Sequence, residues 1–150
     1  MSARTVTLSQ HHAAAPDVVW EMVTSYARLA EVNAPLVTMP NLPAGHVSAG
    51  DVIETEPKLF GLLPLGPYRM EVTACDPAAL RFESAEHGGG VERFEHRLQL
   101  HPEGEGTRVD EAITLDAGPR TALVAAWVRM LYRHRHRRRT ALLAATEGTR

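Results

Sequence analysis

A histidine and a glutamate stand out because each interrupts an alternating apolar pattern late in the chain. In the first pattern every second residue is apolar except the histidine: Phe94, His96, Leu98 and Leu100. The second pattern has the same form around the glutamate: Val109, Glu111, Ile113 and Leu115. A period of two predicts two strands that each turn one face to an apolar interior. We expect the hairpin to set Leu98 opposite Val109, a register that places His96 opposite Glu111.

Two interpretations of this pair remain open. Polar side chains on an apolar wall are costly unless they pair with each other. A carboxylate beside an imidazole raises its basicity and can position it as a general base, which makes His96 and Glu111 the candidate catalytic residues. The alternative is a cross-strand pair with a structural role only.

A second candidate feature is the segment from 59 to 67, which reads Leu-Phe-Gly-Leu-Leu-Pro-Leu-Gly-Pro. It is too apolar for an ordinary exposed loop, and its two prolines disfavour a central strand. With its glycines as hinges it would act as a lid over a cavity, and Phe60, Leu62 and Leu63 would touch the ligand. A loop packed onto the core is an equal alternative.

Other chemistry has little support in the sequence. The histidine pairs at 11 and 12 and at 134 and 136 have no companions at metal-ligand spacing, so we expect no metal. The chain has no phosphate-binding glycine loop of the P-loop or dinucleotide-binding kind, and we expect no cofactor. Cys75 is the only cysteine, which excludes an internal disulfide.

Charge is unevenly distributed along the chain. Residues 1–119 carry a net charge of −9, whereas residues 120–150 carry +7 and include eight arginines. Five of these arginines fall between 133 and 139. Attraction between an acidic body and a basic final helix explains this asymmetry, and a solvated charged face explains the dense run. Nucleic-acid binding is not expected, because Tyr132 is the only aromatic residue near the run.

Length and composition suit one domain over residues 1–150, with 44% apolar and 23% charged residues. The N-terminal residues have no apolar core of a signal peptide, and no apolar run reaches the ~20 residues of a membrane span. We therefore expect a cytoplasmic protein without a membrane span. A homodimer is left open.

The patterns along the chain predict an α+β fold. A strand over 4–11 precedes two short helices, one beginning at Pro16 and one over 26–32. About six antiparallel strands follow between 36 and 116, with a hairpin loop over 102–106. A period of three to four residues then predicts one helix over about 120–145 that buries Trp127 and Leu131. A curved sheet wrapped around this helix buries the apolar faces of both.

Several segments resemble the START-like (SRPBCC, polyketide cyclase/dehydrase-like) superfamily, which has a helix-grip fold. The segment Ala-Ala-Ala-Pro-Asp-Val-Val-Trp over 13–20 is similar to the family's opening helix. Residues 95–98 and 104–110 resemble its paired long strands and their turn, and Gly118 with the arginine-rich helix resembles its closing element. The resemblance implies an apolar cavity and does not fix a reaction.

Three functions follow from these observations. The first is binding of a small hydrophobic molecule, such as a polyketide, lipid or aromatic metabolite, between the sheet and the final helix. The second is a cyclase or aromatase reaction that uses His96 and Glu111. The third is a protein-interaction module that docks through the basic helix or the apolar loop, with an overfilled cavity. The expected ligand contacts are Phe60, Leu62, Leu63, Tyr68, Met70, Phe82, Phe94, Leu98, Ile113, Trp127 and Leu131.

Overall fold

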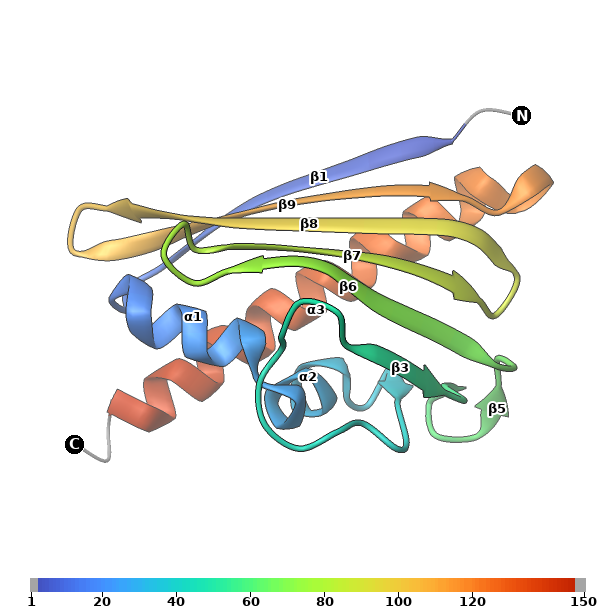
Figure 1. Cartoon of the computed structure of the whole chain (residues 1–150), viewed down its shortest axis with the longest axis horizontal. Helices are drawn as coiled ribbons and strands as arrows, with labels where there is room; N and C mark the ends of the chain where they lie inside the picture. The colour runs from blue at the N-terminus through green and yellow to red at the C-terminus, as the bar shows by residue number, and fades with distance from the viewer. Residues whose placement is uncertain (1–2, 148–150) are drawn as a thin grey trace.

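The computed structural model describes residues 3–147 and consists of a curved antiparallel sheet with helices on one side (Figure 1). Its six strands have the order β1-β9-β8-β7-β6-β3. They are β1 (Arg4–His12), β3 (Val52–Thr55), β6 (Tyr68–Asp76), β7 (Arg81–Gly88), β8 (Val91–Glu103) and β9 (Gly106–Asp116). A smaller sheet has the order β2-β4-β5 and joins β2 (Val37–Thr38), β4 (Lys58–Leu59) and β5 (Leu63–Pro64).

Three α-helices and one short 3₁₀ helix complete the fold. They are α1 (Pro16–Thr24), α2 (Tyr26–Asn33), η1 (Gly118–Arg120) and α3 (Thr121–Glu147). Figure 1 shows α3 running diagonally beneath the length of the sheet, with α1 and α2 beside its C-terminal half. This arrangement is the helix-grip fold, and it confirms the predicted α+β class and the single long final helix.

Local sequence explains where the helices begin. Pro16 occupies the first turn of α1, where its missing N–H leaves no helical hydrogen bond unmade. The Ser25 side chain accepts a hydrogen bond from the Arg28 backbone N–H and caps α2. Before α3, the Thr121 hydroxyl donates to the Gly118 carbonyl and accepts from the Ala117 N–H, which closes the turn between β9 and the helix.

The long hairpin corrects the predicted register. Leu98 pairs with Glu111 and His96 pairs with Ile113, two residues away from the expected alignment. The cause is the turn: the strands extend to Glu103 and Gly106, so only two residues form the loop where the sequence suggested five. A shift of two residues preserves the face of every side chain, and His96 and Glu111 therefore still point inward.

The core lies in two clusters between the sheet and the helices. One gathers residues of β8 and β9 around the first half of α3: Phe94, Ile113, Leu115, Val128, Leu131 and Tyr132. The other joins the opposite end of the sheet to α1 and the end of α3: Val19, Met22, Leu98, Leu100, Val109 and Leu143. These apolar contacts fix the position of α3 across the sheet.

Part of the expected helix pattern is wrong. Leu131 is buried, as predicted, but Trp127 is only half-buried; Leu123, Met130 and Arg137 are exposed. Trp127 and Leu123 border a pocket rather than the packed core, so part of their surface stays open.

Candidate functional site

A buried ion-paired cluster centres on Glu111. Its Oε2 accepts a hydrogen bond from His96 Nε2 at 2.7 Å, and its Oε1 accepts one from Arg139 Nη1 at 2.9 Å. The three residues come from β9, β8 and α3, and their exposed fractions are 3%, 5% and 4%. The predicted proximity of His96 and Glu111 is therefore confirmed, although the two residues are diagonal neighbours rather than directly opposite.

Arg139 was not foreseen as a member of this cluster. The arginine run suggested a solvated face, and that interpretation holds for the exposed Arg133 and Arg137. A buried stripe nevertheless continues along α3 through Val128, Tyr132, Arg139 and Leu143. Extending the apolar period through the charged run would have placed Arg139 toward the sheet, where an acid of the opposite strand needs a cation.

Electrostatics fix the charge of the central carboxylate. Burial acts to raise the pKa of Glu111, but the charge of Arg139 and the hydrogen bonds from His96 and Arg139 outweigh it and hold that pKa well below its usual range. Glu111 is therefore ionised and can only accept hydrogen bonds. It follows that Nε2 of His96 is protonated and donates the hydrogen bond to Glu111.

The His96 ring is packed between aromatic neighbours and also borders a pocket. Phe82 and Tyr132 hold the ring edge-on, with centroid distances of 5.7 Å and 5.3 Å. Within the described residues Nδ1 makes no hydrogen bond, and His96 lines a pocket. In a neutral imidazole with a proton on Nε2, Nδ1 is an acceptor. The arrangement can therefore take up a proton at Nδ1, with Glu111 stabilising the imidazolium that forms.

That pocket has a volume of about 670 Å³ and lies between α3 and the inner face of the sheet. Its walls come from α1, α2, α3 and strands β2 to β8. Eight residues that the sequence predicted for the site line it: Leu63, Tyr68, Met70, Phe82, Phe94, His96, Trp127 and Leu131. Most of the wall is apolar, and its polar side chains include Ser84, Glu86, His96, Arg120, Arg135 and Arg139.

Five predicted residues do not line this pocket. Leu98 and Ile113 are fully buried in the two core clusters, and Glu111 lies behind His96. Phe60 and Leu62 lie in the turn between β4 and β5, with 57% and 83% of their surface exposed. The segment still borders the pocket through Leu59, Leu63 and Leu65.

A second polar group lines the wall, and of its members only Tyr68 was among the expected ligand contacts. The Tyr68 hydroxyl donates to Glu86 Oε1 at 2.7 Å, and the Ser84 hydroxyl donates to Glu86 Oε2 at 2.6 Å. Burial and the neighbouring Glu86 raise the pKa of Tyr68 well above its usual value. The tyrosine therefore stays protonated. The alternation of Phe82, Ser84 and Glu86 along β7 was the available signal.

Two histidines lie together near Arg139. The rings of His12 and His136 are 4.7 Å apart, and His12 Nε2 and His136 Nδ1 have no hydrogen-bond partner among residues 3–147. Burial, with help from the nearby His136 and Arg139, lowers the pKa of His12 to about 4. Over the same residues no group of three or more metal-ligating side chains is close enough to hold a metal ion.

Two further basic residues of α3, His134 and Arg135, contact α2 and the residue that follows it. Arg135 Nε donates to Asn33 Oδ1 at 2.6 Å while its guanidinium lies 4.2 Å over the Tyr132 ring. His134 Nε2 donates to the Ala34 carbonyl at 2.7 Å. Much of the positive charge of α3 is therefore used inside the fold. None of the helices described for residues 3–147 has the length and apolarity that a membrane span requires.

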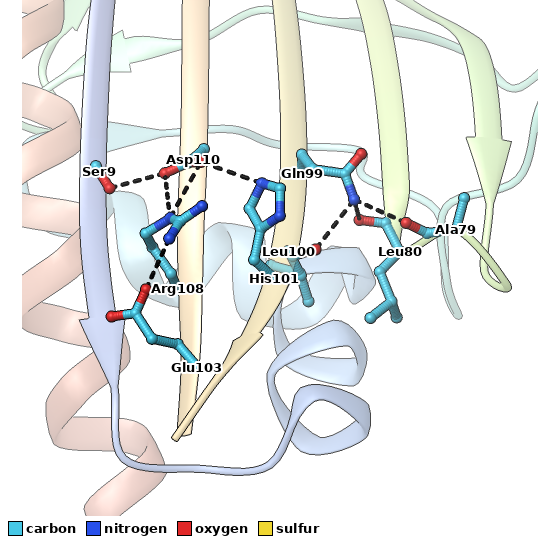
Figure 2. A network of polar contacts seen from close by, with 9 residues as sticks. All are labelled: Ser9, Ala79, Leu80, Gln99, Leu100, His101, Glu103, Arg108 and Asp110. Atoms are coloured by element: carbon cyan, nitrogen blue, oxygen red, sulfur yellow. Dashed lines mark hydrogen bonds and ion pairs between the residues drawn. The ribbon is translucent and has the colours of Figure 1, made fainter. Parts of the chain in front are cut away.

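The opposite face of the sheet carries a separate polar network (Figure 2). Asp110 accepts hydrogen bonds from Ser9 and Arg108 and forms an ion pair with His101, across β1, β9 and β8. Gln99 donates to the Ala79 carbonyl and fastens the turn before β7. These residues alternate with the inward-facing ones and take no part in the pocket between the sheet and α3.

Comparisons with known proteins agree with this architecture. A family model described as "Polyketide cyclase / dehydrase and lipid transport" matches residues 3–143. No protein with a curated description matches the sequence. Protein CV1439 from Chromobacterium violaceum superposes with a TM-score of 0.75 at 16% identity, over 92% of this chain and 95% of its own.

Two further solved structures have the same fold. A protein from Rhodobacter sphaeroides has a TM-score of 0.75 at 22% identity, over 94% of this chain and 93% of its own. Ara h 8.0201 has a TM-score of 0.75 at 12% identity, over 95% of this chain and 99% of its own. At these identities the likeness establishes the fold alone.

Proposed function

The chain belongs to the polyketide cyclase/dehydrase and lipid transport family, and we propose that it binds a small hydrophobic molecule in the pocket between the sheet and α3. The observation that carries this proposal is the pocket itself. Its volume of about 670 Å³ suits a ligand of a few fused rings or a short acyl chain. Apolar walls supply the affinity, and a few polar side chains select orientation.

Native mass spectrometry of the purified protein tests the proposal by detecting a co-purified hydrophobic ligand. Binding of the fluorescent apolar probe 1-anilinonaphthalene-8-sulfonate to stripped protein provides a second readout. Met70 lines the pocket, so Met70→Trp should fill it and weaken probe binding at least tenfold. Leu62→Trp makes a comparable change outside the pocket and should leave binding unchanged. Equal probe binding by both variants and the unmodified chain would contradict the proposal.

An enzymatic role for the same pocket is the second candidate, and the free Nδ1 of His96 favours it. Nδ1 would remove a proton from the carbon between two carbonyl groups of a polyketide-like substrate. The electron pair of the broken C–H bond passes to a carbonyl oxygen as an enolate, and the imidazolium is stabilised by Glu111. The pocket wall would hold the chain in a reactive shape.

Deuterium incorporation at the central carbon of a 1,3-dicarbonyl probe tests this role. The protein should accelerate the exchange above the buffer rate, and His96→Ala should lower the acceleration by about 10²–10⁴-fold. The matched control is His101→Ala on the outer face of β8, which should leave the rate unchanged. Exchange at the buffer rate with bound probe would leave ligand binding as the function.

An interaction module is less well supported. That hypothesis required an overfilled cavity, whereas the pocket holds about 670 Å³. Docking through the basic helix, one of its two routes, is also weakened because Arg135 and Arg139 are engaged within the fold. The exposed Phe60 and Leu62 are the feature that still fits it.

A further inference from the structure

The pocket wall contains a second carboxylate, whose partners differ from those of Glu111. Glu86 lies on β7 and lines the pocket together with Tyr68 and Ser84. Its two oxygens each accept one hydroxyl hydrogen, from Tyr68 and from Ser84. Among residues 3–147 no arginine, lysine or histidine forms an ion pair with it. Two neutral hydroxyl groups are therefore its direct partners.

The direction of these hydrogen bonds decides what the group offers to a ligand. A hydroxyl has one hydrogen, and both hydroxyl hydrogens already point at the carboxylate. The oxygens of Tyr68 and Ser84 therefore present only lone pairs to the pocket. Each carboxylate oxygen of Glu86 also keeps acceptor capacity after accepting one hydrogen bond. This part of the wall accepts hydrogen bonds and donates none.

Such a surface discriminates among apolar ligands. A ligand that covers this surface removes water from the Glu86 carboxylate. If the ligand donates no hydrogen bond, the lost hydration is not replaced, which weakens binding. A carbonyl or ether oxygen meets only lone pairs there. A hydroxyl group donates to the carboxylate or to a hydroxyl oxygen and restores the lost bond. The charge of Glu86 acts on Tyr68 more strongly than the opposing charge of Arg135 on α3, so the field at this part of the wall favours a ligand group that donates a hydrogen bond.

We propose that Tyr68, Ser84 and Glu86 form a subsite for a hydroxyl group, so that the ligand of this pocket is an otherwise apolar molecule bearing a phenol or an alcohol. The inference rests on the proposed ligand-binding function and narrows its ligand class. A contact that only held β6 against β7 would need a single hydroxyl group as the partner of Glu86. Here two hydroxyls from neighbouring strands converge on one carboxylate at the edge of open space.

Matched probes test the subsite directly. 2-Naphthol and its methyl ether, 2-methoxynaphthalene, have the same ring system and differ in one hydrogen-bond donor. Isothermal titration should show 2-naphthol binding about ten- to a hundredfold more tightly, as expected for a hydrogen bond to a charged acceptor. Glu86→Gln, which keeps the shape and removes the charge, should bring the two affinities within about threefold by weakening naphthol alone.

Controls separate this inference from the proposal beneath it. Met70→Leu changes the apolar wall of the same pocket and should alter both affinities alike, preserving their ratio. Because Glu86→Gln could disturb folding, Tyr68→Phe gives an independent check: Glu86 loses the hydrogen bond that Tyr68 donates, so its carboxylate gains acceptor capacity and the preference for naphthol should rise. Equal binding of the two probes to the unmodified protein, or a preference for naphthol that Glu86→Gln does not lower and Tyr68→Phe does not raise, would overturn the hydroxyl subsite and leave hydrophobic binding intact. Failure of both probes to bind would overturn the two proposals together.

Discussion

Removal of Arg139 should destabilise the protein strongly, because it strands the buried Glu111 carboxylate. Breaking a buried ion pair from one side costs about 3–5 kcal/mol. Glu111 is 3% exposed, so water cannot replace the lost partner, but His96 still donates to its second oxygen. We therefore expect Arg139→Met to lower the free energy of unfolding by about 3 kcal/mol, the lower end of that range.

Urea denaturation followed by circular dichroism measures this change, with Arg137→Met as the control. Arg137 lies on the same helix and is exposed, so its loss should stay within about 0.5 kcal/mol of zero. If Arg139→Met proves too unstable to purify, the double variant Arg139→Met with Glu111→Leu should recover much of the stability, because it removes both charges. Equal stabilities of Arg139→Met and Arg137→Met would refute the reasoning.

The pH dependence of the same variant adds a sign test. In the unmodified protein the pKa of Glu111 is lowered on folding. Its contribution to stability is therefore present above the unfolded value of about 4.3 and is lost as the pH falls toward the folded value. Without Arg139, burial dominates and favours the protonated carboxyl group. The stability difference between the variant and the unmodified chain should therefore shrink between pH 7.5 and pH 5, and a constant difference would contradict this account.

Three further predictions address other parts of the fold. Folding lowers the pKa of His12 from its usual value near 6.5 to about 4. The contribution of His12 to the free energy of unfolding is therefore complete above pH 6.5 and is lost as the pH falls toward 4. Urea titrations should show that the stability of His12→Phe depends less on pH in that window. Gly88→Ala should lower the free energy of unfolding by about 3 kcal/mol, measured by thermal or urea unfolding, because φ is +122° and the added Cβ would collide with the Pro67 carbonyl. Gly45→Ala is the control: φ is +87° but the space is open, so the loss should be about 1 kcal/mol. Hydrogen exchange of residues 59–65 should slow when a probe occupies the pocket, and exchange that is already slow and unchanged on binding would indicate a loop packed onto the core.

Much of the fold could be predicted because its signals are periodic. Alternation over 94–100 and 109–115 gave the two longest strands and the inward faces of His96 and Glu111. The same alternation could not fix the register, because a shift of two residues leaves the pattern intact. Only the length of the hairpin turn decides it, and Gly104, at φ +61°, permits a turn of two residues.

The long helix shows a different limit. Its span was predicted correctly, but the burial of individual side chains depends on what lies opposite each turn. Trp127 faces open space and is half-buried, whereas Arg139 faces a strand carboxylate and is buried. Residue type alone suggests the reverse. An arginine is rarely buried unless it is paired, and the sequence does not identify the partner of Arg139.

The two inward-facing glutamates show how one wall can divide structural and ligand-facing work. Glu111 interrupts an apolar pattern and has an ionic partner in Arg139, so its charge is balanced before any ligand arrives. Glu86 lies near the end of β7, two residues after Ser84 on the same face, and its partners are two neutral hydroxyls. A ligand that donates a hydrogen bond can therefore gain energy at Glu86 and none at Glu111. Replacing Glu86 with an apolar residue should change which ligand binds. The same replacement at Glu111 should change whether the protein folds.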